Sequence, residues 1–387
     1  MSLTSASSDG LGQVLYSDRL PKSRFMMPRE DYLKMPLRER LLKLSKSDEE
    51  RASELQEKQV FVDLHTHVFR EFDRARVRNS GVTCFFEAIY QACRYGDFEE
   101  SMRVVGSIAS FVHKQPDMMI ALNHHDILKA KAQSKQAVMF QLEPQTIGRK
   151  LDNIDIAYGF GVRMMLLTFN TRDYIGNGCG ERSDDGLSYY GMEVVDRMNR
   201  IGMLIDVSHC GDSTSRETID TSRDPVLISH GGARALCPRI KRLSTDECIK
   251  ALAEKGGLIG IYAVPNFLAL TERQGIQDVL NHIDYVVKLV GIDHVGIGTD
   301  IQFLDHVAFH RDVMMKSTSF SRIGVELKAK YMEGIENPEE TSNILRGLIA
   351  RGYSDNEISR IAGGNALKVF EKVLGRGGDY TPQYIPS

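Results

Sequence analysis

No apolar stretch in this sequence is long enough to cross a membrane. Every apolar run falls short of the roughly eighteen residues that a spanning helix requires. The first residues, MSLTSASSDGLGQ, contain no basic segment followed by an apolar core, which a secretory signal would need. These absences predict a cytoplasmic protein that has no membrane partner.

Cysteine pairs and an excess of charge are also missing. The six cysteines show no C-x-x-C spacing, and a chain of 387 residues needs no disulfides to fold, so free thiols are expected. They are Cys84, Cys93, Cys179, Cys210, Cys237 and Cys248. Cys210 is expected to pack rather than react, because no nearby feature activates its thiol. The formal net charge of −3, with dispersed Lys and Arg, predicts no nucleic-acid partner.

What the sequence does contain is a regular alternation of short apolar runs with helical or looped segments. A composition of 42% hydrophobic and 26% charged residues suits one large α/β barrel with a tail, or two ordinary domains. Eight runs are expected to be buried parallel strands. They cover residues 60–65, 81–86, 137–143, 162–168, 203–209, 226–230, 258–264 and 294–300. Eight strands alternating with helices over about 240 residues predict a (β/α)₈ TIM barrel.

The segments on both sides of this barrel are expected to lie outside it. Residues 1–59 are predicted to be a partly helical N-terminal extension, which either caps one barrel end or forms a dimer contact. The leucines with helical spacing are Leu37, Leu41, Leu42 and Leu44. Residues 337–374 are predicted to be a helical cluster packed on the outside, and residues 375–387 a tail. Capping-box patterns at residues 244–247 and 354–357 predict two helix starts.

Six polar side chains stand at the predicted C-terminal ends of five strands, and these ends open onto the same rim of a barrel. They are His65, His67, Glu143, His209, His230 and Asp300. The H-x-H spacing aims both imidazoles at one ion, because residues two apart in a strand share a face. Four histidines and two carboxylates suit two divalent ions, with zinc expected and other divalent metals as alternatives.

Such a centre assigns roles to the two carboxylates. Glu143 would bridge the ions, and Asp300 would relay a proton to a leaving nitrogen. Two ions about 3.5–4 Å apart hold a bridging water as hydroxide and polarise a scissile carbonyl. Taken singly, each residue has a plainer interpretation, since a strand-end histidine is often structural and Glu143 or Asp300 could cap a helix. Their joint occurrence favours the metal centre.

The remaining histidines are interpreted as structural or solvated. They are His113, His124, His125, His282, His294, His306 and His310. His306 and His310 follow the last predicted strand, so either could also line a substrate pocket.

The motifs around these residues resemble the membrane (renal-type) dipeptidase family of metallopeptidases, in the amidohydrolase superfamily. The motifs are VDLHTH, QLEP, GMLIDVSH, LISHGGARALCP, GGLIGIYAVPNFL, VGIGTD and RGYSDNEISRIAGGNALKVFEKV. The resemblance implies that residues 60–374 form a binuclear zinc hydrolase domain, in a homodimer or higher homo-oligomer, that cleaves dipeptides with a free carboxylate. It also implies the distribution of ligands. His65, His67 and Asp300 would bind one ion, His209 and His230 the other, and Glu143 both.

The sequence departs from the family pattern around the expected substrate. His67 stands where the family usually has Asp, a change that keeps a metal ligand. Phe169 stands where the family has a histidine that contacts the substrate carbonyl, and phenylalanine cannot donate a hydrogen bond. Val264 replaces a tyrosine, and residues 301–303, IQF, replace an F-D-G run.

Six residues are candidates for substrate binding. They are Phe169, Asn170, Arg234, Lys241, Arg242 and Tyr262. The segment ARALCPRIKRLSTDE has one residue more than the family pattern, which leaves open whether Lys241 or Arg242 meets a substrate carboxylate. The residues that could supply the missing hydrogen-bond donor are Asn170, Arg172, Tyr174 and Tyr262.

These features predict a binuclear zinc enzyme that hydrolyses a dipeptide-like amide bond in a small-molecule substrate. One alternative is a hydrolase of a non-peptide amide, a lactam or a lactone. A second is a non-catalytic barrel that retains the metal site, and Phe169 is the residue that favours it.

Overall fold

The computed structural model describes residues 44–70, 72–89, 98–143, 146–271, 274–301, 322–325, 332–335 and 338–374. Some sequence predictions concern residues outside these ranges. They are Leu37, Leu41 and Leu42 of the N-terminal helix, Cys93, Gln302 and Phe303, His306 and His310, and the tail 375–387.

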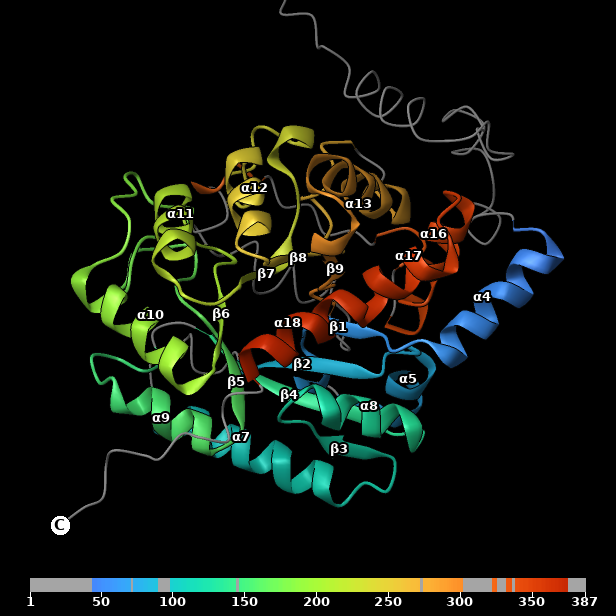
Figure 1. The fold of residues 1–387 in the computed structure, drawn as a ribbon, viewed down its shortest axis with the longest axis horizontal. Coiled ribbons are helices and arrows are strands. Elements are labelled where there is room, and N and C mark those ends of the chain that lie inside the picture. Colours follow the sequence, from blue (N-terminus) through green and yellow to red (C-terminus); the bar gives the residue numbers. More distant parts are fainter. Residues whose placement is uncertain are drawn as a thin grey trace, which may run out of the picture.

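Eight parallel strands close into a barrel, which confirms the predicted fold (Figure 1). They are β1 Val62–Thr66, β2 Cys84–Ile89, β4 Gln136–Leu142, β5 Val162–Leu166, β6 Leu204–Asp206, β7 Val226–Gly231, β8 Leu258–Ile261 and β9 Val295–Ile297. The order around the barrel is β2-β1-β9-β8-β7-β6-β5-β4, and β4 pairs with β2 to close it. Every one of these strands overlaps its predicted run.

A ninth strand, β3 Met118–Ile120, was not predicted. It pairs in parallel with the first residues of β4, before β4 begins to pair with β5. Three residues are too few for a period to be recognised in the sequence. β3 therefore lies beside the barrel and is not one of its eight strands.

Helices fill the connections between strands. Those within the barrel sequence are α5 Arg74–Asn79, α7 Phe98–His113, α8 His124–Ala132, α9 Asp152–Gly159, α10 Tyr189–Ile201, α11 Asp212–Thr221, α12 Asp246–Glu254 and α13 Ile276–Val290, with short turns η1 Val68–Arg70, η2 Arg234–Leu236 and η3 Ile292–His294. Before the barrel lies α4 Lys46–Lys58, and after it lie η5 Pro338–Glu340, α16 Asn343–Ala350, α17 Asp355–Ser359, η6 Arg360–Gly364 and α18 Asn365–Leu374. None of the helices in the described ranges has the length and apolarity that crossing a bilayer requires.

Helix α18 of the predicted C-terminal cluster packs across the N-terminal end of the barrel and closes it. Inward-facing residues at the strand starts, such as Val62 and Leu204, form one buried cluster with residues of α18. Within it, the rings of Phe86 and Phe370 lie 5.3 Å apart. The buried stripe of α18 has helical spacing and consists of Ala366, Val369, Phe370 and Val373. The sequence showed this stripe but not the surface that it covers.

Helix α4 packs against the C-terminal helices. Ala52 and Leu55 on its inner face are buried. Arg346 Nε of α16 donates a hydrogen bond to Glu49 at 2.9 Å, and Arg51 Nε donates one to Asp355 at 2.6 Å. The described end of the predicted extension is thus fixed to the opposite end of the chain, while the domain boundary at residue 59 stays a prediction.

The two predicted helix starts have different outcomes. At α17, Ser354 and Glu357 form the reciprocal capping box that the sequence indicates. At α12 the cap is Thr245, whose Oγ1 accepts from Cys248 N at 3.2 Å, so the helix starts one residue later than predicted. The reason is that Ser244 is held in a parallel bridge with Ala233.

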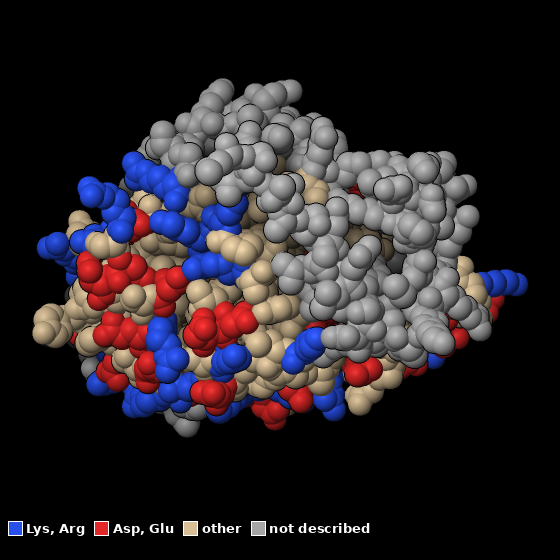
Figure 2. All heavy atoms as spheres, turned by 90° about the horizontal axis from the view of Figure 1, so that it is seen from above, with Lys and Arg blue, Asp and Glu red and all other residues tan. Residues whose placement is uncertain are grey.

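The described surface carries charges of both signs. In Figure 2, groups of Lys and Arg lie beside groups of Asp and Glu. Some form helical pairs four residues apart, such as Arg200 with Asp196 in α10 and Arg216 with Asp220 in α11. Exposed pairs of this kind are screened by water and salt, so they contribute little to the stability of the barrel.

His282 of α13 joins the segments that follow β7 and β8. Its Nδ1 accepts a hydrogen bond from Ala233 N, and its Nε2 donates one to Leu268 O, both at 3.0 Å. Burial lowers the pKa of His282 to about 4. A second proton would also place an N–H group against the Ala233 N–H, so the folded state requires the neutral ring.

We expect His282→Gln to weaken the pH dependence of the free energy of unfolding between pH 4 and 6.5. In this window the unfolded histidine binds a proton and the folded one does not, so the contribution is complete above pH 6.5 and is lost toward pH 4. His282 contributes about 3 kcal/mol at most to the change in the free energy of unfolding across this window. Urea denaturation across this window measures it, with the exposed His113→Gln as matched control. A wild-type pH dependence in His282→Gln would contradict this role.

Candidate active site

The six predicted metal ligands lie where barrel strands end. His65 lies in β1 and His67 directly follows it. The others end or follow β4, β6, β7 and β9, and they are Glu143, His209, His230 and Asp300. All are buried except Asp300, whose side chain is 23% exposed. The parallel strands thus deliver six polar groups to the C-terminal rim.

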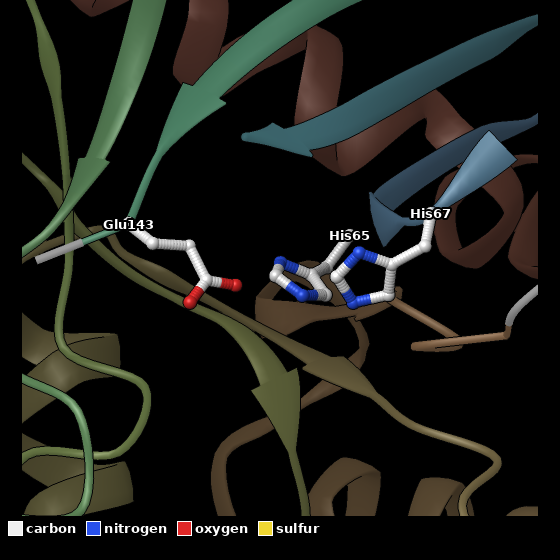
Figure 3. A group of neighbouring side chains, drawn as sticks. All are labelled: His65, His67 and Glu143. Atoms are coloured by element: carbon white, nitrogen blue, oxygen red, sulfur yellow. The ribbon is translucent and has the colours of Figure 1, made fainter. Parts of the chain in front are cut away.

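One half of this cluster gathers around the H-x-H pair. A ligand atom from each of His65, His67 and Glu143 lies within 4.8 Å of the other two. Figure 3 shows the Glu143 carboxylate directed toward the two imidazole rings. Asp300 Oδ1 lies 3.2 Å from His67 Nε2 and 3.6 Å from His65 Nε2. Two imidazoles and two carboxylates therefore meet at one point of the rim.

His209 and His230 continue the cluster on the side of β6 and β7. The rings of His230 and His65 stack with centroids 3.7 Å apart, and the Nε2 atoms of His230 and His209 lie 3.1 Å apart. Two zinc–nitrogen bonds of about 2.0–2.1 Å at a tetrahedral angle would separate their nitrogens by about 3.3 Å. This spacing and the mixed imidazole and carboxylate donors fit divalent ions.

Burial keeps the imidazoles in the form that binds metal. It lowers the pKa of His65 to about 3, although the nearby Asp300 carboxylate favours the charged ring. It also holds the pKa values of His209 and His230 well below the ordinary range, and Arg242 adds to the effect. Neutral rings keep a lone pair for a cation.

The backbone near the cluster is strained and tightly packed. His209 and Asp300 have φ of +65° and +56°, a left-handed conformation that costs energy for residues with a side chain. Next to His230, a Cβ on Gly260 or Gly298 would lie 2.1 or 1.8 Å from Ser229 O. Only glycine permits β8 and the segment that follows β9 to approach Ser229 of β7 this closely.

Phe169 forms an apolar wall of the cluster. Its ring stacks on the His209 ring, with centroids 4.2 Å apart and an angle of 22° between the planes. The neighbouring Asn170 is buried, and its Oδ1 lies 2.7 Å from His209 Nδ1. The residue that departs from the family pattern therefore touches a predicted metal ligand.

Of the three predicted cationic candidates, the structure brings Arg242 to the cluster. Its buried guanidinium donates a hydrogen bond from Nη2 to His230 O at 2.9 Å and lies 5.6 Å from the Tyr262 ring centre. Arg234 instead forms a double hydrogen bond to Asp212, at 2.6 and 2.7 Å. Lys241 is exposed. The sequence could not choose between these cations, because the choice depends on how the segment folds.

Two of the four predicted replacement donors are buried near the cluster. Tyr262 Oη and Asn170 Nδ2 have no hydrogen-bond partner within the described part of the chain. Arg172 is exposed and donates to Asn177 and Asp185, and Tyr174 is half exposed. Tyr262 and Asn170 therefore remain as candidates.

Among the other predictions, the described cysteines are buried and unpaired, as expected. Thr168 Oγ1 donates a hydrogen bond to Cys210 Sγ at 3.2 Å, and burial raises the pKa of Cys210 well above its ordinary value. Its protonated thiol fits the predicted packing role. His294 Nδ1 donates a hydrogen bond to Gly257 O at 2.9 Å, a structural contact.

Three buried polar residues beneath the histidines were missed by the sequence analysis. Gln141, Asp206 and Ser229 lie in β4, β6 and β7 and are fully buried. Their signal was a polar residue within an otherwise apolar strand, shortly before a predicted ligand. Strands buried on both faces rarely carry such residues without a hydrogen-bonding reason.

Solved structures share this fold. An amidohydrolase from Pseudomonas aeruginosa aligns with a TM-score of 0.75 at 26% identity, covering 84% of this chain and 99% of that chain. A metallo peptidase from Rhodobacter sphaeroides, liganded with a phosphinate mimic of the dipeptide L-Ala-D-Ala, aligns with a TM-score of 0.66 at 17% identity. The latter alignment covers 82% of this chain and 100% of the other, and at this identity it shows the fold alone.

Relatives by sequence include dipeptidases. Dipeptidase aclJ of Aspergillus oryzae is 24% identical over 327 residues, or 80% of this chain and 71% of that protein. Dipeptidase 3 of Rattus norvegicus is 25% identical over 323 residues, or 81% of this chain, which spans only 60% of the rat protein. The sequence model of membrane dipeptidase, peptidase family M19, matches residues 46–329. Because this match extends over most of the chain and confirms the resemblance of its motifs, the protein belongs to the membrane dipeptidase family of peptide-bond hydrolases.

Proposed function

We propose that this chain is a dipeptidase-like hydrolase that works with two bound divalent ions, zinc first among them. The observation that carries the proposal is the convergence of six ligand-type side chains from five strands on one buried cluster. One ion would be held by His65, His67 and Asp300, the other by His209 and His230, and both by Glu143.

The chain's own residues would position the reacting groups. When bound, the ions supply Lewis-acid polarisation of the scissile carbonyl and activation of water. Glu143 would hold its negative charge between the two groups of histidines. Asp300 is the most accessible ligand, so its carboxylate is placed to carry a proton to the leaving nitrogen. Burial of the rings strengthens each of these electrostatic contacts.

Arg242 is the residue that would bind the carboxylate of a dipeptide. A guanidinium stays charged when buried and pairs with a carboxylate through two hydrogen bonds. Its Nη2 contact with His230 O would place that substrate group next to a predicted metal ligand. Arg234 and Lys241, which the sequence also allowed, do not have this position.

Phe169 favours a substrate with an apolar group near the His209 side of the cluster. For this reason the second candidate function is hydrolysis of a non-peptide amide, a lactam or a lactone by the same residues. Tyr262 or Asn170 would then supply the hydrogen bond that Phe169 cannot donate. A cytoplasmic location and a homodimer or higher homo-oligomer remain predictions from the sequence.

One prediction of this proposal concerns the bridging carboxylate. Purified wild-type protein should retain about two zinc ions per chain after dialysis, and Glu143→Gln about one or fewer, because a neutral amide cannot neutralise a pair of dications. Elemental analysis measures this content, and dipeptide hydrolysis should fall with it. The control is Cys210→Ser, a change at another buried position, which should keep its metal. Equal metal contents in the two variants would contradict the bridging role.

A second prediction separates the three cations. We expect Arg242→Met to lower kcat/KM for dipeptides by roughly 10- to 150-fold. This factor corresponds to the loss of about 1.5–3 kcal/mol, which hydrogen bonds to a charged group contribute. Lys241→Met should leave kcat/KM unchanged. On dipeptide amides, which lack the carboxylate, Arg242→Met and wild type should be similarly poor. If Arg242→Met lost as much on the amides as on the acids, Arg242 would not be the carboxylate site.

A third prediction concerns Phe169. If the family histidine stabilises the developing oxyanion, Phe169→His should raise kcat/KM for small dipeptides toward the roughly 10²–10³-fold that one such donor contributes. The same change should lower turnover of bulky N-acyl amino acids, since the apolar wall is lost. Phe169→Leu is the control, because it keeps the wall apolar and adds no donor. No change with either substrate set would show that Phe169 only packs against His209.

A further inference from the structure

Asp206 lies at the centre of a hydrogen-bond network beneath the histidine cluster. It is fully buried in β6 and accepts five hydrogen bonds, from one amide, two backbone N–H groups and two hydroxyls. Gln141 Nε2 donates to Oδ2 at 2.6 Å, while Ser208 N, Ser208 Oγ and Ser229 N donate to Oδ1 at 2.9, 2.7 and 2.9 Å. Ser229 Oγ donates to Oδ2. Burial raises the pKa of Asp206, but the hydrogen bonds from Ser208 and Ser229 oppose this and favour the ionised form. An ionised carboxylate only accepts, so it fixes the direction of every one of these bonds.

The first branch of the network leads to His65. Because Gln141 directs its NH₂ group to Asp206, its Oε1 faces the other way and accepts a hydrogen bond. His65 Nδ1 lies 2.6 Å from this oxygen and must therefore carry the proton. In a neutral ring the lone pair is then on Nε2, the atom that faces Asp300.

The second branch leads to His230. The Ser229 hydroxyl donates its hydrogen bond to Asp206. Its oxygen therefore accepts a hydrogen bond from His230 Nδ1, which lies 2.8 Å away. The proton of His230 is thus on Nδ1, and the lone pair on Nε2 faces His209 Nε2 at 3.1 Å. The same carboxylate therefore determines the tautomer of two histidines on different strands.

The surroundings of the Asp206 carboxylate support this assignment of the His65 and His230 tautomers. Within the described ranges no Lys or Arg side chain pairs with Asp206, whereas the buried Asp284 pairs with Arg351 and with the Tyr353 hydroxyl. A buried anion without a cation is costly. Positive charge bound at the Nε2 atoms of His65 and His230 would compensate it through the two branches.

We propose that Asp206 is the positioning residue of both metal sites, orienting His65 through Gln141 and His230 through Ser229 so that both present Nε2 to the ions. The inference rests on the proposed metal centre and adds that a single carboxylate connects its two halves. Such outer partners typically change metal affinity by about 10- to 100-fold.

The tautomers can be read directly in the metal-free protein. Two-bond ¹H–¹⁵N spectra of chain labelled with ¹⁵N-histidine distinguish Nδ1–H from Nε2–H rings, and the losses in His65→Gln and His230→Gln identify the two signals. We expect both rings as Nδ1–H in wild type. Ser229→Ala should shift only His230 toward Nε2–H, Gln141→Leu only His65, and Asp206→Asn both. Asp284→Asn, a change of the same kind in another buried carboxylate, should shift neither.

Zinc affinity, measured by competition with a chromophoric chelator, gives the second readout. Asp206→Asn should weaken the binding of both ions by about 10- to 100-fold, and Ser229→Ala the binding of one, relative to Asp284→Asn. Should Asp206→Asn fail to fold, the two branch variants still decide the matter. Wild-type tautomers and zinc affinity in Ser229→Ala and Gln141→Leu would overturn the proposal. A protein that binds zinc as expected but hydrolyses no dipeptide would refute the proposed function and leave this inference intact.

Discussion

The site depends on the removal of four imidazole rings from water. A buried polar ring needs a partner for each nitrogen, or it destabilises the fold. One nitrogen of each of three rings has such a partner within the barrel, namely Gln141 for His65, Asn170 for His209 and Ser229 for His230. The remaining Nε2 atoms of His209 and His230 face each other, and that of His65 faces a carboxylate. In these three rings the fold therefore satisfies one nitrogen and leaves the other for a ligand.

The architecture of the barrel brings these buried polar residues together and holds them in place. Parallel strands end at one rim, so residues that are distant in sequence meet there without long loops. Glycines at 260 and 298 let the strands approach closely beside His230. At the opposite end of the strands, apolar side chains and α18 form a compact base. Strain at His209 and Asp300 can persist because the surrounding barrel holds their backbone in place.

The sequence was sufficient to predict the strands and the polar residues that lie at the rim. Apolar runs such as 226–230 are continuous because both faces are buried, and a polar residue at the end of such a run must reach the rim. It was not sufficient where the outcome depends on tertiary packing. Arg234, Lys241 and Arg242 are equivalent cations in sequence, and only the folded segment directs Arg242 to His230. Asp206 was read as part of an apolar strand, since its five donors come from three separate strands or strand ends.

The position of α18 has a consequence for the way in which the barrel assembles. At the N-terminal end of the barrel, Phe86 of β2 lies beside Phe370 of α18, the last described helix. Almost the whole barrel sequence separates these two residues along the chain. Until that helix docks, the inner apolar layer is open to water at one end. Contacts of such large sequence separation form late and slow the folding of a domain. A nascent barrel is therefore most exposed to misassociation just before α18 docks, even when all six rim side chains have already been synthesised.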